Sequence, residues 1–122
     1  MIRATVETLP SFVLGEWRRG AGEGLLVRDA VYGQPVARVS SDGLDLAEVL
    51  RHAREVGGPK LRAMTFHERA LMLKALAQHL MEHKEAFYEL SYASGTTRRD
   101  AWVDLEGGFG TFFSYSSLAR RE

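Results

Sequence analysis

Apolar and polar positions repeat with a helical period from Thr65 to Gly95, the longest patterned segment of the chain. The apolar side consists of Phe66, Leu73, Leu76, Ala77, Leu80 and Phe87. The opposite side carries His67, Lys74, Gln78, Glu82, Glu85 and Glu89. Thr65 and Glu68 have capping-box spacing and Gly95 supplies a stop. The pattern predicts one helix over 65–94, a rod of roughly 45 Å.

A second helical pattern covers 98–120, starting after Thr97 with Asp100 three residues later. Its apolar face consists of Trp102, Leu105, Phe109, Phe112 and Phe113. Three glycines, at 107, 108 and 110, lie in its middle. Each costs a helix interior roughly 1 kcal/mol relative to alanine, so they either admit a neighbouring backbone or mark a break. We favour close packing.

The first half of the chain has shorter patterns. Asp45 and Glu48 have capping-box spacing before a short helix that Gly57-Gly58-Pro59 should end. Upstream, strand-like segments at 12–18, 25–28 and 35–39 are separated by glycine-rich turns. The chain should therefore be mainly α: an antiparallel β-hairpin over about 12–39, then three helices at about 45–57, 65–94 and 98–120.

Composition restricts the class of protein. Sixteen acidic and sixteen basic residues cancel among 122, so no basic field would gather nucleic acid. No apolar run has the length of a signal peptide core or a membrane span, so we expect a cytoplasmic protein without membrane contact. The chain has no cysteine, which removes disulfides, thiolate ligands and a thiol nucleophile.

One pattern could bind a metal ion. His79, Glu82 and His83 match H-x-x-E-H, in which two histidines one helical turn apart hold zinc and the glutamate acts as base. A catalytic zinc needs a third protein ligand from elsewhere, and short patterns arise readily by chance. We interpret the two histidines as half-exposed and predict no metal site.

The remaining candidates have simpler explanations. The run 106–110 lacks the G-x-G-x-x-G spacing and follows no strand, and Gly20, Gly22 and Gly24 precede no helix. Serines 114, 116 and 117 lack a nucleophile elbow, and Glu82 and Glu85 lie on a polar helix face. We assign no catalytic, cofactor-binding or metal-binding residue to this chain.

Several segments nevertheless resemble the amino-terminal part of the aldehyde dehydrogenase family. FVLGEW at 12–17 resembles its opening strand, VYGQPVARVSS at 31–41 its glycine turn and following strand, and 67–95 its long helix. Two positions depart from the family pattern: Asp29-Ala30 replaces an Asn-Pro, and Gly95-Thr96-Thr97 replaces a Gly-Lys-Pro.

Segments 40–77 and 94–122 are most similar to one branch, the ring-opening enzymes of bacterial phenylacetate degradation, which join a semialdehyde dehydrogenase to an oxepin-CoA hydrolase domain. Semialdehyde dehydrogenases of the benzoyl-CoA epoxidation pathway share the Ser-Gly-Thr-Thr-Arg and Gly-Gly elements and are the alternative.

The resemblance implies an α/β parent enzyme that oxidises a CoA-linked semialdehyde to the acid with NAD or NADP. Residues 1–122 would be the front of its nucleotide-binding domain, cut at 122 and inert alone, with the catalytic residues in later sequence. The aromatic face defined above would then contact the rest of the polypeptide or a second copy. A different reading is a free-standing helical module that binds a protein partner through the same face.

Overall fold

The chain reverses direction twice within its first forty residues. In the computed structural model, which describes residues 6–118, β1 (Ser11–Val13) pairs antiparallel with β2 (Glu16–Arg18). The two-residue turn between them places Leu14 at φ 56° and Gly15 at φ 87°. Positive φ at both central residues is typical of a type I′ hairpin. The predicted single strand over 12–18 is therefore wrong, because the chain turns at its centre.

A second hairpin joins β3 (Leu25–Arg28) to β4 (Pro35–Val39), with an irregularity in register after Val27. The expected antiparallel arrangement is confirmed, but as two separate two-stranded sheets. Glycines explain why the 19–24 loop lies against the end of β4. A Cβ built on Gly20 would lie 2.2 Å from the carbonyl oxygen of Ser40, and one on Gly24 would lie 2.5 Å from that of Val39.

The turn between β3 and β4 is organised by one carboxylate. Asp29 accepts hydrogen bonds from the backbone N–H groups of Val31 (3.0 Å), Tyr32 (2.5 Å) and Gln34 (2.6 Å). Aspartate has this capacity because its ionised side chain accepts several bonds at once. The departure from Asn at position 29 thus keeps an acceptor where the turn needs one. These bonds, that from Tyr32 foremost, lower the pKa of Asp29 from its ordinary 3.8.

Helical backbone begins at α1 (Leu46–His52), where the Asp45 side chain accepts from the Glu48 N–H at 2.9 Å. It continues through a π-helical turn, Ala53–Gly57, into α2 (Gly58–Ala63). The predicted end at Gly57-Gly58-Pro59 is wrong. Neither glycine has positive φ, and Pro59 occupies the first turn of α2, where its missing N–H is not needed. The wider π turn interrupts the α pattern just before this proline.

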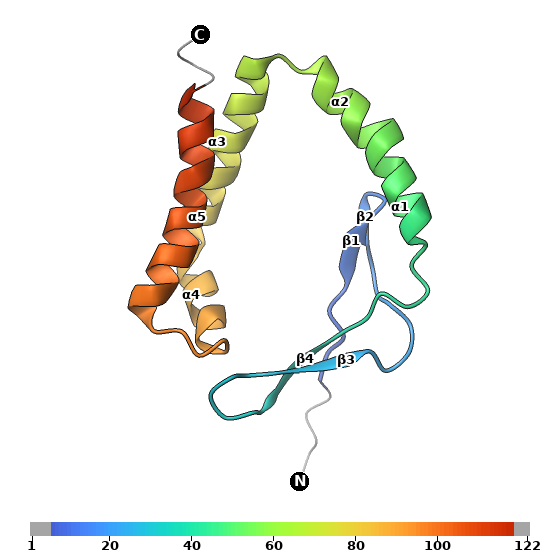
Figure 1. Ribbon diagram of the computed structural model, residues 1–122, viewed down its shortest axis with the longest axis vertical. Helices are drawn as coiled ribbons and strands as arrows, with labels where there is room; N and C mark the ends of the chain where they lie inside the picture. The colour runs from blue at the N-terminus through green and yellow to red at the C-terminus, as the bar shows by residue number, and fades with distance from the viewer. Residues whose placement is uncertain (1–5, 119–122) are drawn as a thin grey trace. The chain divides into compact units, whose positions relative to one another are not determined.

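The predicted long helix is two helices, α3 (Phe66–Glu82) and α4 (Lys84–Tyr92), with His83 between them at φ −104° and ψ 11°. The capping box of Thr65 and Glu68 is confirmed, as is the end near Gly95, where φ is 81°. The single rod over 65–94 is wrong. Both α3 and α4 contact α5 (Arg98–Leu118), the last helix in Figure 1.

Helix α5 begins where predicted. The Thr97 hydroxyl accepts from the Asp100 N–H at 3.2 Å and donates to its carboxylate at 2.7 Å. The helix runs unbroken through all three glycines, and a Cβ on any of them would meet nothing within 4 Å. Neither the break nor the close neighbour is therefore found within residues 6–118. The predicted end at 120 lies outside the described residues.

Burial is concentrated among the last three helices. Among the described residues, the buried side chains of this region are Ala70, Ala77, Tyr88, Ala101, Phe109 and Ser116. Small residues on α3 and α5 let these helices lie side by side, as Figure 1 shows. Phe109 packs edge-to-face on Phe87 of α4, with ring centroids 5.7 Å apart. The chain divides at Gly57–Gly58 into two compact units, and among the described residues of the first, 6–57, Ala37 is the buried apolar one.

Within residues 6–118, no helix combines the length and the apolar character needed to cross a membrane.

Candidate functional site

A polar cluster joins α4 to α5. The Glu106 carboxylate accepts hydrogen bonds from the Lys84 ammonium group at 3.0 Å and from the Tyr88 hydroxyl at 2.9 Å. Tyr88 is only 2% exposed, so its hydroxyl requires this partner. The bond from Lys84, followed by that from Tyr88, lowers the pKa of Glu106, whereas burial raises the pKa of Tyr88. Tyr88 therefore stays protonated near neutral pH and acts as a donor.

Arg98 completes this cluster from the start of α5. Its guanidinium lies 4.3 Å from the centroid of the Tyr88 ring and hydrogen-bonds both carboxylate oxygens of Glu85, at 2.9 and 3.0 Å. Two neighbouring charged residues at the start of α4, Lys84 and Glu85, are thus paired with residues of α5. This arrangement positions the two helices, and both donors bind the same oxygen of the Glu106 carboxylate. We interpret it as a structural cluster.

Glu106 is absent from the residues that the sequence predicts to be important, although its position carries a signal. Positions 102, 106, 109 and 113 follow the spacing of four, three and four that defines one helix seam. A carboxylate within an otherwise aromatic seam needs a polar partner when the seam is buried.

The predicted aromatic face is only partly a surface. Phe109 is buried in the helical unit, while Leu105, Phe112 and Phe113 are half-buried. Trp102 is exposed over 56% of its surface. The buried face of α5 is centred nearer to Ala101 and Ser116, which are buried in the helical unit.

The structure does bring His79, Glu82 and His83 together. One ligand atom from each lies within 4.8 Å of the others, and all three side chains are exposed. The centroids of the His79 and His83 rings are 4.3 Å apart.

The glycines and serines of the other rejected motifs are accounted for by the backbone. The run 106–110 lies inside α5. Ser114, Ser116 and Ser117 donate to carbonyl oxygens three or four residues earlier, so each hydroxyl bonds within its own helix. Glu85 pairs with Arg98, whereas Glu82 is exposed beside His79 and His83.

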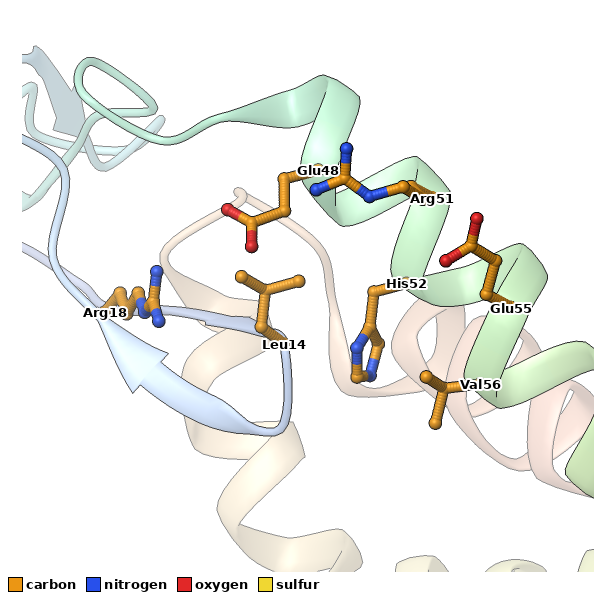
Figure 2. A pocket seen from close by; sticks show the side chains of 7 residues that line it. All are labelled: Leu14, Arg18, Glu48, Arg51, His52, Glu55 and Val56. Carbon is orange, nitrogen blue, oxygen red and sulfur yellow. The ribbon is translucent and has the colours of Figure 1, made fainter.

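The first unit contains a pocket of about 330 Å³ that the sequence did not predict. It is lined by Leu14, Arg18, Glu48, Arg51, His52, Glu55 and Val56. Figure 2 shows Glu48 and His52 pointing from α1 toward Leu14 of the first hairpin. Its charges are of both signs, and no salt bridge joins two of its residues within the described part of the chain.

Comparisons with known proteins place these elements in a family. The model of the aldehyde dehydrogenase family matches residues 17–122. A 3,4-dehydroadipyl-CoA semialdehyde dehydrogenase from Aromatoleum evansii is 42% identical to this chain over 113 residues. That match covers 92% of this chain and 22% of the relative, so the chain spans about a fifth of the relative's length. The chain belongs to the aldehyde dehydrogenase family.

Proposed function

We propose that this chain is the amino-terminal part of the nucleotide-binding domain of an NAD(P)-dependent dehydrogenase that oxidises a CoA-linked semialdehyde during the degradation of aromatic compounds. The observation that carries the proposal is the 42% identity, over 92% of the chain, to a relative with a CoA semialdehyde in its name. The relative's name describes a dehydrogenase alone, which favours the benzoyl-CoA epoxidation branch over the phenylacetate ring-opening branch.

The described residues act as scaffold in this proposal. Oxidation of an aldehyde to an acid by NAD(P)+ transfers a hydride to the nicotinamide and adds the oxygen of one water. The glycines at 107, 108 and 110 lie inside α5, and the 19–24 loop is followed by β3, not by a helix N-terminus. These residues do not fit a dinucleotide phosphate, so no step of the reaction is assigned to them.

The activity can be tested with the complete product of the reading frame that contains this chain. Purified enzyme should form reduced nicotinamide with 3,4-dehydroadipyl-CoA semialdehyde and NAD+ or NADP+. Adipic semialdehyde, which lacks the CoA thioester, is the matched control and should give a much lower kcat/KM. Equal kcat/KM for both aldehydes would contradict a CoA-linked substrate, and no oxidation of either would contradict the dehydrogenase assignment.

We further propose that the remainder of the parent polypeptide packs on the face of α5 that points away from its buried side. Positions 103, 107, 110, 114 and 117 define this small-residue face and hold Val, Gly, Gly, Ser and Ser. They repeat at spacings of four and three, which places them on one side of the helix. Glycines there cost helix stability, yet a Cβ on Gly107 or Gly110 would meet no atom within 4 Å. Close approach of a further backbone would explain them.

Two glycine substitutions test this interface. Gly107 belongs to the small-residue face, whereas Gly108 lies on another side of α5, and both are exposed. In the 122-residue chain, Gly107→Ala and Gly108→Ala should each stabilise by up to about 1 kcal/mol, since alanine is the better helix former. In the complete protein, Gly107→Ala should lower the melting temperature while Gly108→Ala should not. If both variants raise the melting temperature of the complete protein equally, no backbone approaches this face.

A further inference from the structure

Three side chains that can bind a metal ion lie where α3 ends: His79 and Glu82 in its last turn, and His83 directly after it. Glu82 and His83 follow His79 by three and four positions, so one helical turn brings both close to His79. A ligand atom of each lies within 4.8 Å of the other two. Two ligands of one zinc ion, each about 2.0–2.2 Å from the metal, are at most about 4.4 Å apart. Small side-chain rotations would therefore bring the three atoms to bonding distance of a shared ion.

A hydrogen bond of His83 determines which of its ring nitrogens is free to bind a metal ion. Nδ1 of His83 lies 2.8 Å from the carbonyl oxygen of His79. Because a carbonyl oxygen only accepts, Nδ1 carries the hydrogen, and the neutral ring keeps its lone pair on Nε2. Metal-binding histidines commonly donate their second ring N–H to a backbone carbonyl in this way, which fixes the tautomer and the ring orientation.

The three side chains are also available. All are exposed, and none takes part in a salt bridge within the part of the chain that the structure describes. By contrast, the nearby Lys84 and Glu85 are paired with Glu106 and Arg98. The carboxylate of Glu82 supplies a negative charge, which attracts a dication.

We propose that His79, Glu82 and His83 form a surface site for a divalent transition-metal ion. The donor set of two nitrogens and one oxygen suits zinc, copper(II) and nickel, with water completing the coordination. Glu82 acts as a ligand in this site. Affinity should be highest for copper(II), as expected for nitrogen-containing sites, and magnesium or calcium should not compete because both prefer sets made entirely of oxygen. The site is independent of the dehydrogenase activity proposed above.

Calorimetric titration of the metal-free chain with zinc chloride tests the site. One ion should bind per chain. Loss of a residue that only hydrogen-bonds to a metal ligand typically weakens metal binding about 10- to 100-fold. Loss of a ligand itself should have at least this effect, so His79→Gln or His83→Gln should weaken zinc binding at least about tenfold. Glu82→Gln should also weaken it. His67→Gln is the matched control, since His67 is an exposed histidine at the other end of α3, and it should leave the affinity unchanged.

Copper(II) provides a second measurement that counts ligands. The electron paramagnetic resonance spectrum should show coupling to two imidazole nitrogens in the parent chain and to one in each single histidine variant. The circular dichroism of every variant should match the parent, because the substituted side chains are exposed. Absence of saturable zinc binding would overturn the proposal. Binding that survives the double variant His79→Gln, His83→Gln would also overturn it.

Discussion

The two units of this chain are held together by different interactions. The helical unit after Gly57 buries Tyr88 and Phe109 together with small residues of α3 and α5, and Phe109 packs edge-to-face on Phe87. Among residues 6–57, the hairpin unit buries one apolar side chain, Ala37. Its turns are fixed by backbone hydrogen bonds and by the Asp29 carboxylate. Side-chain burial stabilises the second unit, whereas local backbone geometry shapes the first.

The exposed aromatic residues of the hairpins follow from this difference. Phe12, Trp17 and Tyr32 are 60%, 69% and 81% exposed. Two-stranded hairpins are marginally stable in water because they can bury little apolar area. A unit of this kind depends more on partners outside itself than the helical unit does. The match to about a fifth of a longer relative is consistent with such a dependence.

The largest expected effect comes from replacing a buried phenylalanine of the helical unit, compared with replacing an exposed phenylalanine of the hairpin unit. Phe109→Ala should lower the free energy of unfolding by about 3–5 kcal/mol, because it opens a cavity between α4 and α5. Phe12→Ala is the matched change on an exposed ring, which loses its edge-to-face contact with Trp17 at 5.2 Å. It should cost less than about 1.5 kcal/mol. Urea denaturation of both variants would measure this, and equal losses would remove the contrast between the units.

A smaller effect of opposite sign is expected at the first hairpin turn. Leucine in the left-handed region at φ 56° carries a penalty of roughly 1–2 kcal/mol, and asparagine tolerates this region better. Leu14→Asn should therefore stabilise the chain by up to about 1 kcal/mol in thermal unfolding. Leu14→Ala is the control, because it removes the same side chain and leaves the backbone preference unfavourable. Equal melting temperatures for the two variants would show that backbone conformation is not the cause.

The smallest expected effect is the response of Asp29 to pH. Its pKa in the folded chain is below its ordinary 3.8, chiefly because the Tyr32 N–H donates to it. The unfolded state therefore takes up the proton first as the pH falls. The stability that Asp29 contributes is complete above 3.8 and is lost as the pH falls toward the lower, folded value.

Urea titrations at several pH values between neutrality and acid would detect this loss. The parent chain should have a higher free energy of unfolding than Asp29→Ala, and this difference should shrink below pH 3.8. The free energy of unfolding of Asp29→Asn should change less with pH, because asparagine cannot ionise. An advantage over Asp29→Ala that is independent of pH would mean that the carboxylate charge does not stabilise the turn.

Local signals predicted helix starts well. The side chains at Asp45, Thr65 and Thr97 all accept from an N–H three residues later, as their spacing indicated. Such bonds involve four consecutive residues, so they can be recognised in sequence. The type I′ turn at Leu14-Gly15 is equally local, but leucine is an unusual residue there and concealed the reversal.

The features that the sequence did not predict depend on contacts between residues that are distant in sequence. The division of 65–94 at His83 coincides with contacts of Lys84 and Tyr88 to Glu106, which lies twenty-two and eighteen positions away from them. The metal-binding cluster is different, because H-x-x-E-H is visible in sequence and only its accessibility required the structure. The pocket around Arg18 and His52 combines separate elements and has no local signature.

The two tryptophans of the chain fall one in each unit, Trp17 on β2 and Trp102 on α5. Each can therefore serve as a fluorescent reporter of its own half. Replacing either one by phenylalanine leaves a single emitting indole, and both indoles are exposed, so neither replacement disturbs a buried core. Tryptophan fluorescence of these two variants can thus report whether the hairpin unit or the helical unit unfolds first.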